Sequence, residues 1–367
     1  MTLPEWQALY ELGLRMRERP GDFAQSCAGK LVATLFYEPS TRTQLSFQAA
    51  ALRLGAQVIG FSGTGGSSVA KGENLKDTVR TVANYVDAIV MRHPQEGAAL
   101  AASLFSEVPV VNAGDGGHLH PTQTLTDLFT ISLEKGRLSG LTVGICGDLL
   151  NGRTVHSLIK ALVRFPGNRF VLISTPALRI PDYVRAVLQQ TGTPFCEADT
   201  LEEAMGGLDI LYMTRIQRER FESRQAYERE AGVYVLDAAK LALARQDLLV
   251  LHPLPKVDEI THEADADPRC RYFEQARNGM FIRMALLHTL LRQGRQTPPP
   301  PAPDAAPTPA ASRRQSPICP PSPTGRTAST ATRRPCCDAA CAAPRRAAPA
   351  GAGGGHRLRR AGAGHPG

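Results

Sequence analysis

The chain has 367 residues, of which 43% are hydrophobic and 21% are charged, a composition typical of a globular enzyme or binding protein with one or two domains. The sequence lacks a run of about 18 apolar residues and a signal peptide at its start, so we expect a cytoplasmic protein with no membrane partner. The net charge of +8 arises entirely beyond residue 295, from ten arginines and two aspartates. The neutral remainder therefore gives no reason to expect nucleic acid as a partner.

Residues 296–367 differ sharply in composition from the rest of the chain. Fifteen of the 28 prolines lie there, together with many alanines and arginines. Such a segment has too few apolar side chains to bury a core, so we predict a disordered tail. Two other interpretations remain: the read-through or out-of-frame end of a GC-rich gene, or an arginine-rich segment that contacts nucleic acid.

The cysteines outside that tail are Cys27, Cys146, Cys196 and Cys270. They are widely spaced and form no CxxC pair. In a cytosolic chain of this size, this spacing predicts free, buried thiols rather than disulfides or a metal site.

Short apolar runs alternate with helical patterns along the rest of the chain, after an amphipathic helix within residues 1–20. In the first half of the chain, the predicted strand LVATLF is followed by a helix at 44–54. The next predicted units, each a strand with the helix after it, are VIGF with NLKDTVRTVANYV, AIVMR with GAALAASLF, and VPVVNA with PTQTLTDLFTISL. The second half predicts LTVGICGD with RTVHSLIKALVRF, RFVLIST with PDYVRAVLQQ, DILYMT with a polar helix, VYVLDA, DLLVLHP, and a closing helix at 272–293. Strands separated by helices predict an α/β fold with parallel sheets covered on both faces.

The glycines of EKGRLSG, at 136 and 140, mark a boundary near the middle of these units. We therefore predict a first domain at 1–135, a second at 136–295 and the tail at 296–367. Ligands of such folds bind at the carboxyl ends of strands, so we expect a site in the cleft between the two domains.

The segment PSTRT at 39–43 stands where the predicted strand LVATLF meets a helix. Hydroxyls of Ser40, Thr41 and Thr43, the Arg42 guanidinium and the backbone N–H groups of a helix start all favour an anion of phosphate size. Ordinary capping of the helix by serine or threonine is the competing interpretation.

Other polar residues stand in loops that follow predicted strands, where they would converge on the same cleft. They are Lys71 in a glycine-rich loop, Arg92, His120, Gln123, Arg153, Arg215 and Gln217, and a proline-locked loop around Leu254 follows the last predicted strand. One such residue would carry little information, but several at successive strand ends indicate a binding site.

Taken in order, PSTRT, SSVAKGE, VMRHPQEG, HPTQTLTDLFTI, GRTVHSL, YMTRIQRER, VLHPLPKVDEI and YFEQARNGMFIRMALL resemble the catalytic chains of the aspartate carbamoyltransferase family. The resemblance spans about residues 5–293 and leaves out the tail. It implies two α/β domains with the last helix packed back on the first. It also implies transfer of a carbamoyl group from carbamoyl phosphate to L-aspartate in pyrimidine synthesis, without a metal, a cofactor or a covalent intermediate.

The resemblance also implies roles for individual residues. The residues expected to bind the phosphate are Ser40, Thr41, Arg42 and Thr43. Arg92 is expected to bridge the phosphate and the carbamoyl oxygen, with Thr43 and His120 as further donors to that oxygen. Gln123 and the carbonyls around Pro253 and Leu254 are expected to fix the carbamoyl NH₂. The residues expected to hold the aspartate carboxylates are Arg153, Arg215 and Gln217. Ser67 and Lys71 are expected to complete the site of a neighbouring subunit, which implies a homotrimer, and a regulatory chain is a further possible partner.

The sequence departs from the family at Gln44 and Gln48, where arginine and glutamate are common, and at Lys256, where arginine is common. The first two changes together remove one helical ion pair, and the third would loosen a contact and weaken aspartate binding. The short strand usual before the first helix is also expected to be missing. The rivals are ornithine carbamoyltransferase, whose HCLP and SMG motifs are replaced here by HPLP and Arg215-Ile-Gln217, another carbamoyltransferase, and a non-catalytic phosphate-binding paralogue.

Overall fold

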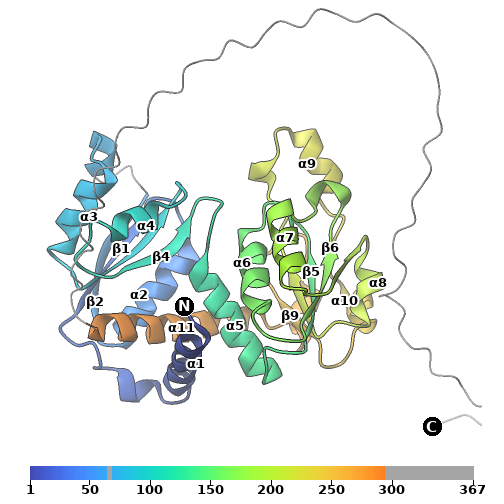
Figure 1. Ribbon diagram of the computed structural model, residues 1–367, viewed down its shortest axis with the longest axis horizontal. Coiled ribbons are helices and arrows are strands. Elements are labelled where there is room, and N and C mark those ends of the chain that lie inside the picture. The colour runs from blue at the N-terminus through green and yellow to red at the C-terminus, as the bar shows by residue number, and fades with distance from the viewer. Residues whose placement is uncertain (64–67, 294–367) are drawn as a thin grey trace, which may run out of the picture. The chain divides into compact units, whose positions relative to one another are not determined.

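The computed structural model describes residues 1–63 and 68–293, within which two sheets are parallel throughout. The strand order is β2-β1-β3-β4 in the first sheet and β7-β6-β5-β8-β9 in the second (Figure 1). The strands are β1 Leu31–Phe36, β2 Gln57–Ser62, β3 Ala88–His93, β4 Val110–Asp115, β5 Thr142–Cys146, β6 Arg169–Ile173, β7 Phe195–Ala198, β8 Ile210–Met213 and β9 Leu249–Leu251. The predicted α/β class is confirmed.

Helices connect these strands, and their ends follow from local sequence. In the first helix, Thr2 and Glu5 bond reciprocally to each other's backbone N–H, a capping box that fixes its start. The α-helices are α1 Leu3–Glu18, α2 Thr41–Arg53, α3 Leu75–Ala83, α4 Ala98–Ser103, α5 Pro121–Lys135, α6 Arg153–Leu162, α7 Asp182–Gln190, α8 Leu201–Met205, α9 Arg224–Glu230, α10 Ala238–Ala242 and α11 Tyr272–Arg292. None of the helices in the described part of the chain is long and apolar enough to cross a membrane.

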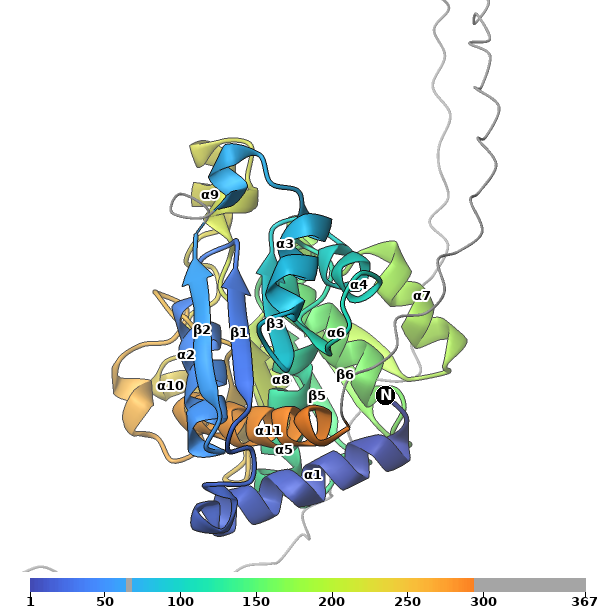
Figure 2. The ribbon, with the colours of Figure 1, turned by 90° about the vertical axis from the view of Figure 1, so that its left-hand side faces the viewer.

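The first sheet is covered on both faces, as the alternation along β1 shows. Val32 and Phe36 belong to a core with residues of α1, α2 and α11, whereas Ala33 and Leu35 belong to a second core with residues of α3 and α4 (Figure 2). Successive side chains of a strand point to opposite faces, so a strand buried on both sides reads as a continuous apolar run.

The last helix, α11, packs against α1, α2 and α5, all of which belong to the first half of the chain. Its apolar residues, among them Ile282 and Leu287, lie in the same core as Val32 of β1. The predicted return of the closing helix is therefore confirmed, and α11 also contacts β9 at its beginning.

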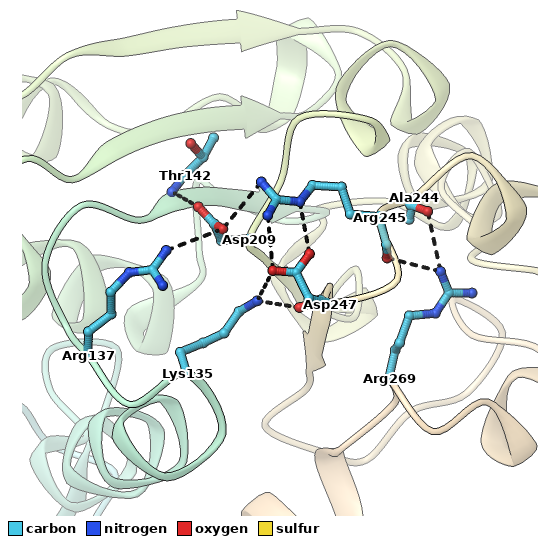
Figure 3. A network of polar contacts seen from close by, with 8 residues as sticks. All are labelled: Lys135, Arg137, Thr142, Asp209, Ala244, Arg245, Asp247 and Arg269. Atoms are coloured by element: carbon cyan, nitrogen blue, oxygen red, sulfur yellow. Dashed lines mark hydrogen bonds and ion pairs between the residues drawn. The ribbon is translucent and has the colours of Figure 1, made fainter.

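The predicted boundary segment is tied to the second sheet by ion pairs (Figure 3). Helix α5 ends at Gly136, which has a positive φ of 66°. Lys135 pairs with Asp247 at 3.4 Å and Arg137 with Asp209 at 3.5 Å. Ion pairs with an exposed partner, such as these, contribute little to the free energy of unfolding. The domain limits at residues 135 and 295 remain a prediction.

The strand predicted for VYVLDA, 233–238, is wrong. Only Leu236 pairs there, in an isolated bridge with Ile260. Tyr234 and Leu236 are both buried, and their alternation imitates a strand. They pack instead into a core with residues of α8, α10 and the strands of the second sheet.

Four other elements differ from the prediction: the start of α2, the strand β7, and the short helices α8 and α10, neither of which was predicted. Helix α2 begins at Thr41 and not at Gln44, because Ser40 already occupies the cap position. The edge strand β7 was not predicted, since it has only four residues and Glu197 interrupts the apolar run that marks a strand. Cys27, Cys146 and Cys270 are free thiols, as predicted. Cys27 and Cys146 are also buried as predicted, whereas Cys196 and Cys270 are only partly buried. The predicted disordered tail lies outside the described residues.

Candidate active site

Residues from both sheets line one cavity of about 750 Å³. It lies at the carboxyl ends of strands, as expected for an α/β fold. The predicted site residues among its lining are Ser40, Thr41, Arg42, Thr43, Arg92, His120, Gln123, Arg153, Arg215, Gln217, Pro253 and Leu254. Two predicted residues are not placed in it: Ser67 lies outside the described residues, and Lys71 is exposed on the short helix Ser68–Lys71 and does not line this cavity.

The start of α2 forms the first wall of the cavity. Its cap residue, Ser40, makes no side-chain capping hydrogen bond, so the capping interpretation of PSTRT finds no support here. The positive end of a 13-residue helix and the side chains of Ser40, Thr41, Arg42 and Thr43 face the cavity instead. Backbone donors and a guanidinium at a helix start form a favourable environment for an anion.

Arg92 lies near the end of β3 and is buried among polar groups. Its Nη2 donates to Glu38 Oε1 at 2.9 Å, and its Nη1 donates to the Ala113 carbonyl at 3.4 Å. The same Nη1 lies 3.5 Å from His120 Nε2, and Arg92 Nε has no hydrogen-bond partner. A buried guanidinium with an unused donor is suited to a ligand oxygen.

His120 precedes α5, whose first residue is Pro121, and its side chain is buried with no partner at Nδ1. Burial, followed by the charges of Arg92, Arg153 and Arg283, holds the pKa of His120 well below its usual range. The imidazole is therefore neutral at physiological pH, and one ring nitrogen carries a proton that it can donate to a ligand.

The second sheet contributes a group of residues after β5 and β8. Arg153 is the first residue of α6, and burial followed by Arg92 lowers its pKa. Gln217 is positioned by two bonds: its Nε2 donates to the Asn151 carbonyl at 3.1 Å, and its backbone N–H donates to Asp148 Oδ2 at 3.4 Å. Arg215 lines the cavity two residues before Gln217. The loop after β5 and the loop after β8 are therefore joined by hydrogen bonds, and Arg153 and Arg215 both line the same cavity.

The turn that leaves β5 requires glycine. Gly147 has a φ of 116°, and a Cβ at this position would lie 2.3 Å from the carbonyl oxygen of Thr214, which precedes Arg215. We expect Gly147→Ala to lower the free energy of unfolding by about 3 kcal/mol, from backbone strain and a steric clash. Chemical denaturation measures this loss.

Gly192→Ala is the matched control. Gly192 has a positive φ of 64° but no atom within 4 Å of the added Cβ, so only backbone strain applies and we expect a loss of about 1 kcal/mol. Equal losses at the two positions would contradict the steric argument.

The cavity is strongly cationic. Its lining holds a single carboxylate, Glu38, among the described residues. The lining arginines are Arg42, Arg92, Arg153, Arg215, Arg220 and Arg283. Such a set suits ligands that carry several negative charges. The described residues contain no group of three histidines, cysteines or acids placed to hold a metal ion.

Three of these lining residues were not predicted from the sequence: Glu38, Arg220 and Arg283. Each lies within a conspicuous motif, at the head of PSTRT, in YMTRIQRER and in the closing helix. Other residues of those motifs were given functional roles in the sequence analysis. Glu38 could also have been predicted, because it stands next to the PSTRT segment.

Two of the residues at which the sequence departs from the family, Gln48 and Lys256, make specific polar contacts. Gln48 Nε2 donates to Thr34 Oγ1 at 3.2 Å, which anchors α2 to β1 without an ion pair. Lys256 pairs with Asp265 at 3.2 Å. Both substituted side chains therefore retain structural contacts, while the predicted weakening of aspartate binding by Lys256 stays a prediction.

Comparison with known proteins agrees with the family resemblance of the sequence motifs. Residues 1–133 match the family described as "Aspartate/ornithine carbamoyltransferase, carbamoyl-P binding domain", and residues 139–290 match "Aspartate/ornithine carbamoyltransferase, Asp/Orn binding domain". The aspartate carbamoyltransferase catalytic subunit of Clostridium perfringens is 56% identical over 291 residues, 79% of this chain and 95% of the relative. That of Clostridium novyi is 55% identical over 290 residues, again 79% and 95%.

Solved structures agree with these relatives. The catalytic subunit of M. jannaschii aspartate transcarbamoylase matches with a TM-score of 0.76 and 42% identity, over 80% of this chain and 96% of that one. Aspartate transcarbamoylase from Trypanosoma cruzi in complex with N-(phosphonacetyl)-L-aspartic acid matches with a TM-score of 0.74 and 39% identity, over 79% and 93%. The resemblance expected from the motifs is confirmed, and the chain belongs to the aspartate/ornithine carbamoyltransferase family.

Proposed function

We propose that this chain transfers the carbamoyl group of carbamoyl phosphate to the amino group of L-aspartate, giving N-carbamoyl-L-aspartate and phosphate for pyrimidine synthesis in the cytoplasm. Relatives that are 55–56% identical are named aspartate carbamoyltransferase catalytic subunits. The Trypanosoma cruzi neighbour forms a complex with carbamoyl phosphate and aspartate. The observation that carries the proposal is the single cavity in which arginines from both sheets meet.

Carbamoyl phosphate binds at the wall formed by the first sheet. Its phosphate accepts hydrogen bonds from the start of α2 and from Ser40, Thr41, Arg42 and Thr43, which all line the cavity. The carboxylate of Glu38 lies 2.9 Å from Arg92 Nη2. The arriving phosphate therefore competes with Glu38 for that guanidinium.

The carbamoyl oxygen lies near Arg92, His120 and Thr43, which act as donors. When the amine nitrogen of aspartate attacks the carbamoyl carbon, negative charge builds on this oxygen, and preorganised donors stabilise it by roughly 3 kcal/mol each. A neutral His120 fits this role, because it donates a proton in a hydrogen bond without adding a fourth charge beside the arginines.

Aspartate binds at the wall formed by the second sheet. Its two carboxylates accept hydrogen bonds from Arg153, Arg215 and Gln217. The carbon–nitrogen bond then forms as the carbon–oxygen bond to phosphate breaks, and the leaving phosphate takes the amine proton. Holding two reactants together in this way contributes about 7 to 11 kcal/mol.

The test is release of phosphate from carbamoyl phosphate by the purified full chain, with L-aspartate or with L-ornithine as acceptor. We expect turnover with aspartate and none with ornithine, whose cationic side chain would meet arginines, and we expect mass spectrometry to identify N-carbamoyl-L-aspartate. Turnover with ornithine alone would make the chain an ornithine carbamoyltransferase. Binding of carbamoyl phosphate without turnover of either would make it a non-catalytic paralogue.

We further propose a homotrimer whose active sites are shared between subunits. Lys71 is exposed and does not line the cavity of its own chain, as a residue that serves a neighbouring subunit would be placed. Ser67 of the same loop is assigned the same role. A regulatory chain as an additional partner remains a prediction from the resemblance alone.

Mixing two inactive variants tests the shared site. We expect Arg42→Ala and Lys71→Ala subunits to be inactive alone and to regain part of the activity when refolded together, because some mixed trimers contain one intact site. The measurement is specific activity against mixing ratio. A mixture that stays as inactive as its components would contradict the shared site.

A further inference from the structure

The carboxylate of Asp127 joins three elements beneath the cavity. It lies on α5 with no exposed surface. Its Oδ1 accepts hydrogen bonds from Gln123 Nε2 and Gln275 Nε2, both at 2.7 Å, and its Oδ2 accepts one from the Tyr212 hydroxyl at 3.1 Å. Gln275 belongs to α11 and Tyr212 to β8. One buried side chain therefore links α5, the second sheet and the closing helix.

The two glutamines have their amide orientation fixed by this carboxylate. Asp127 Oδ1 only accepts, so each glutamine must point its NH₂ group toward it and its carbonyl oxygen elsewhere. The oxygen of Gln275 accepts the backbone N–H of His252 at 3.0 Å. Gln123 lies one helical turn before Asp127 and lines the cavity, where its oxygen is left to accept from a ligand.

The bond to His252 positions the loop that follows β9. This loop contains Leu254, whose φ of 57° is unusual for a residue with a side chain. Its N–H donates to His252 Nδ1 at 2.8 Å, and His252 Nε2 lies 2.8 Å from Glu259 Oε1. A backbone in a rare conformation persists only where its surroundings fix it, and Gln275 provides part of that support.

We infer that Asp127 is a positioning residue that orients, through Gln123 and Gln275, the two sets of carbonyl oxygens that recognise the NH₂ of a carbamoyl group. The inference rests on the proposed function, because it assigns the acceptors of that substrate. Asp127 itself does not line the cavity and touches no substrate. Its effect is on selectivity for NH₂ over groups that cannot donate.

The test compares binding of three ligands to the full chain by titration calorimetry: carbamoyl phosphate, acetyl phosphate and inorganic phosphate. Acetyl phosphate carries a methyl group where carbamoyl phosphate carries NH₂. We expect Asp127→Leu, which keeps the size of the side chain but removes the acceptors, to weaken carbamoyl phosphate binding about tenfold. Affinities for acetyl phosphate and phosphate should stay within about twofold of wild type.

Three further variants make the test specific. Asp127→Asn should bind like wild type, because its single oxygen can still accept from both glutamines while its NH₂ donates to the Tyr212 hydroxyl oxygen. Gln275→Met leaves Asp127 and Gln123 in place but releases the loop, so we expect a smaller loss, again confined to carbamoyl phosphate. Thr130→Val is the matched control, since it removes another buried α5–α11 hydrogen bond, the one from Asn278 at 3.3 Å, without touching the network.

Equal weakening of all three ligands in Asp127→Leu would assign Asp127 a purely structural role and overturn the inference. If the leucine variant does not fold, Gln275→Met decides, and unchanged carbamoyl phosphate binding in that variant overturns the inference as well. Since the readout is binding and not turnover, a failed reaction with aspartate contradicts the proposed function without altering this result.

Discussion

Arg92→Ala is expected to lower kcat/KM for carbamoyl transfer by at least about 1000-fold, because in the proposed mechanism its side chain contacts both the leaving phosphate and the developing oxyanion. The guanidinium is buried between Glu38, the Ala113 carbonyl and His120. No water can replace a fixed, charged donor in that position without a loss of transition-state stabilisation. Steady-state kinetics with both substrates varied measures the effect.

Two control variants separate the loss of the Arg92 donor from other consequences of the substitution. Arg92→Ala leaves Glu38 as an uncompensated carboxylate beside the phosphate, so the double variant with Glu38→Gln removes that repulsion, and we expect most of the loss to persist. Arg53→Ala, at the exposed end of α2, should retain wild-type activity. Recovery of full activity in the double variant would show that repulsion, and not a lost donor, caused the defect.

Arg215→Ala is expected to raise the KM for aspartate at least about 100-fold while leaving binding of carbamoyl phosphate nearly unchanged, because a guanidinium paired with a desolvated carboxylate contributes roughly 2 to 5 kcal/mol. Arg215 follows β8 of the second sheet, whereas the proposed phosphate site lies on the first. The measurement is the rate against aspartate concentration at saturating carbamoyl phosphate.

Arg218 provides the matched control for this prediction. It lies three residues further along the same loop, is exposed and does not line the cavity. Arg218→Ala should therefore leave both KM values unchanged. An increase in the KM for carbamoyl phosphate that equals the increase for aspartate in Arg215→Ala would contradict the division of the cavity into two walls.

Much of the fold follows from local pattern in the sequence. Continuous apolar runs such as LVATLF became strands buried on both faces, and the start and end of α5 coincide with Pro121 and Gly136. These signals are local, since a strand's burial and a helix's ends depend on a few neighbouring residues. Where burial had another cause, as at Tyr234 and Leu236, the same pattern predicted a strand wrongly.

The candidate site was predictable to the extent that parallel strands bring their carboxyl ends together. Arg92 and Arg215 were placed by that rule, and both line the cavity. The partners of these residues were not predictable in the same way. Gln275 and Asp127 are 148 positions apart, and only the packing of α11 on α5 brings them within 2.7 Å of each other. Contacts between distant segments leave no periodic signal in a single sequence.

The central claim is that one cavity binds both substrates at once, and titration with N-(phosphonacetyl)-L-aspartic acid tests it most directly. This ligand joins a phosphonate to an aspartate in a single molecule, and it occupies the Trypanosoma cruzi neighbour. We predict one molecule bound per chain, displaced by carbamoyl phosphate, with affinity reduced strongly by Arg42→Ala at one wall and by Arg215→Ala at the other. Binding that is insensitive to either substitution, or that carbamoyl phosphate does not displace, would contradict a shared cavity.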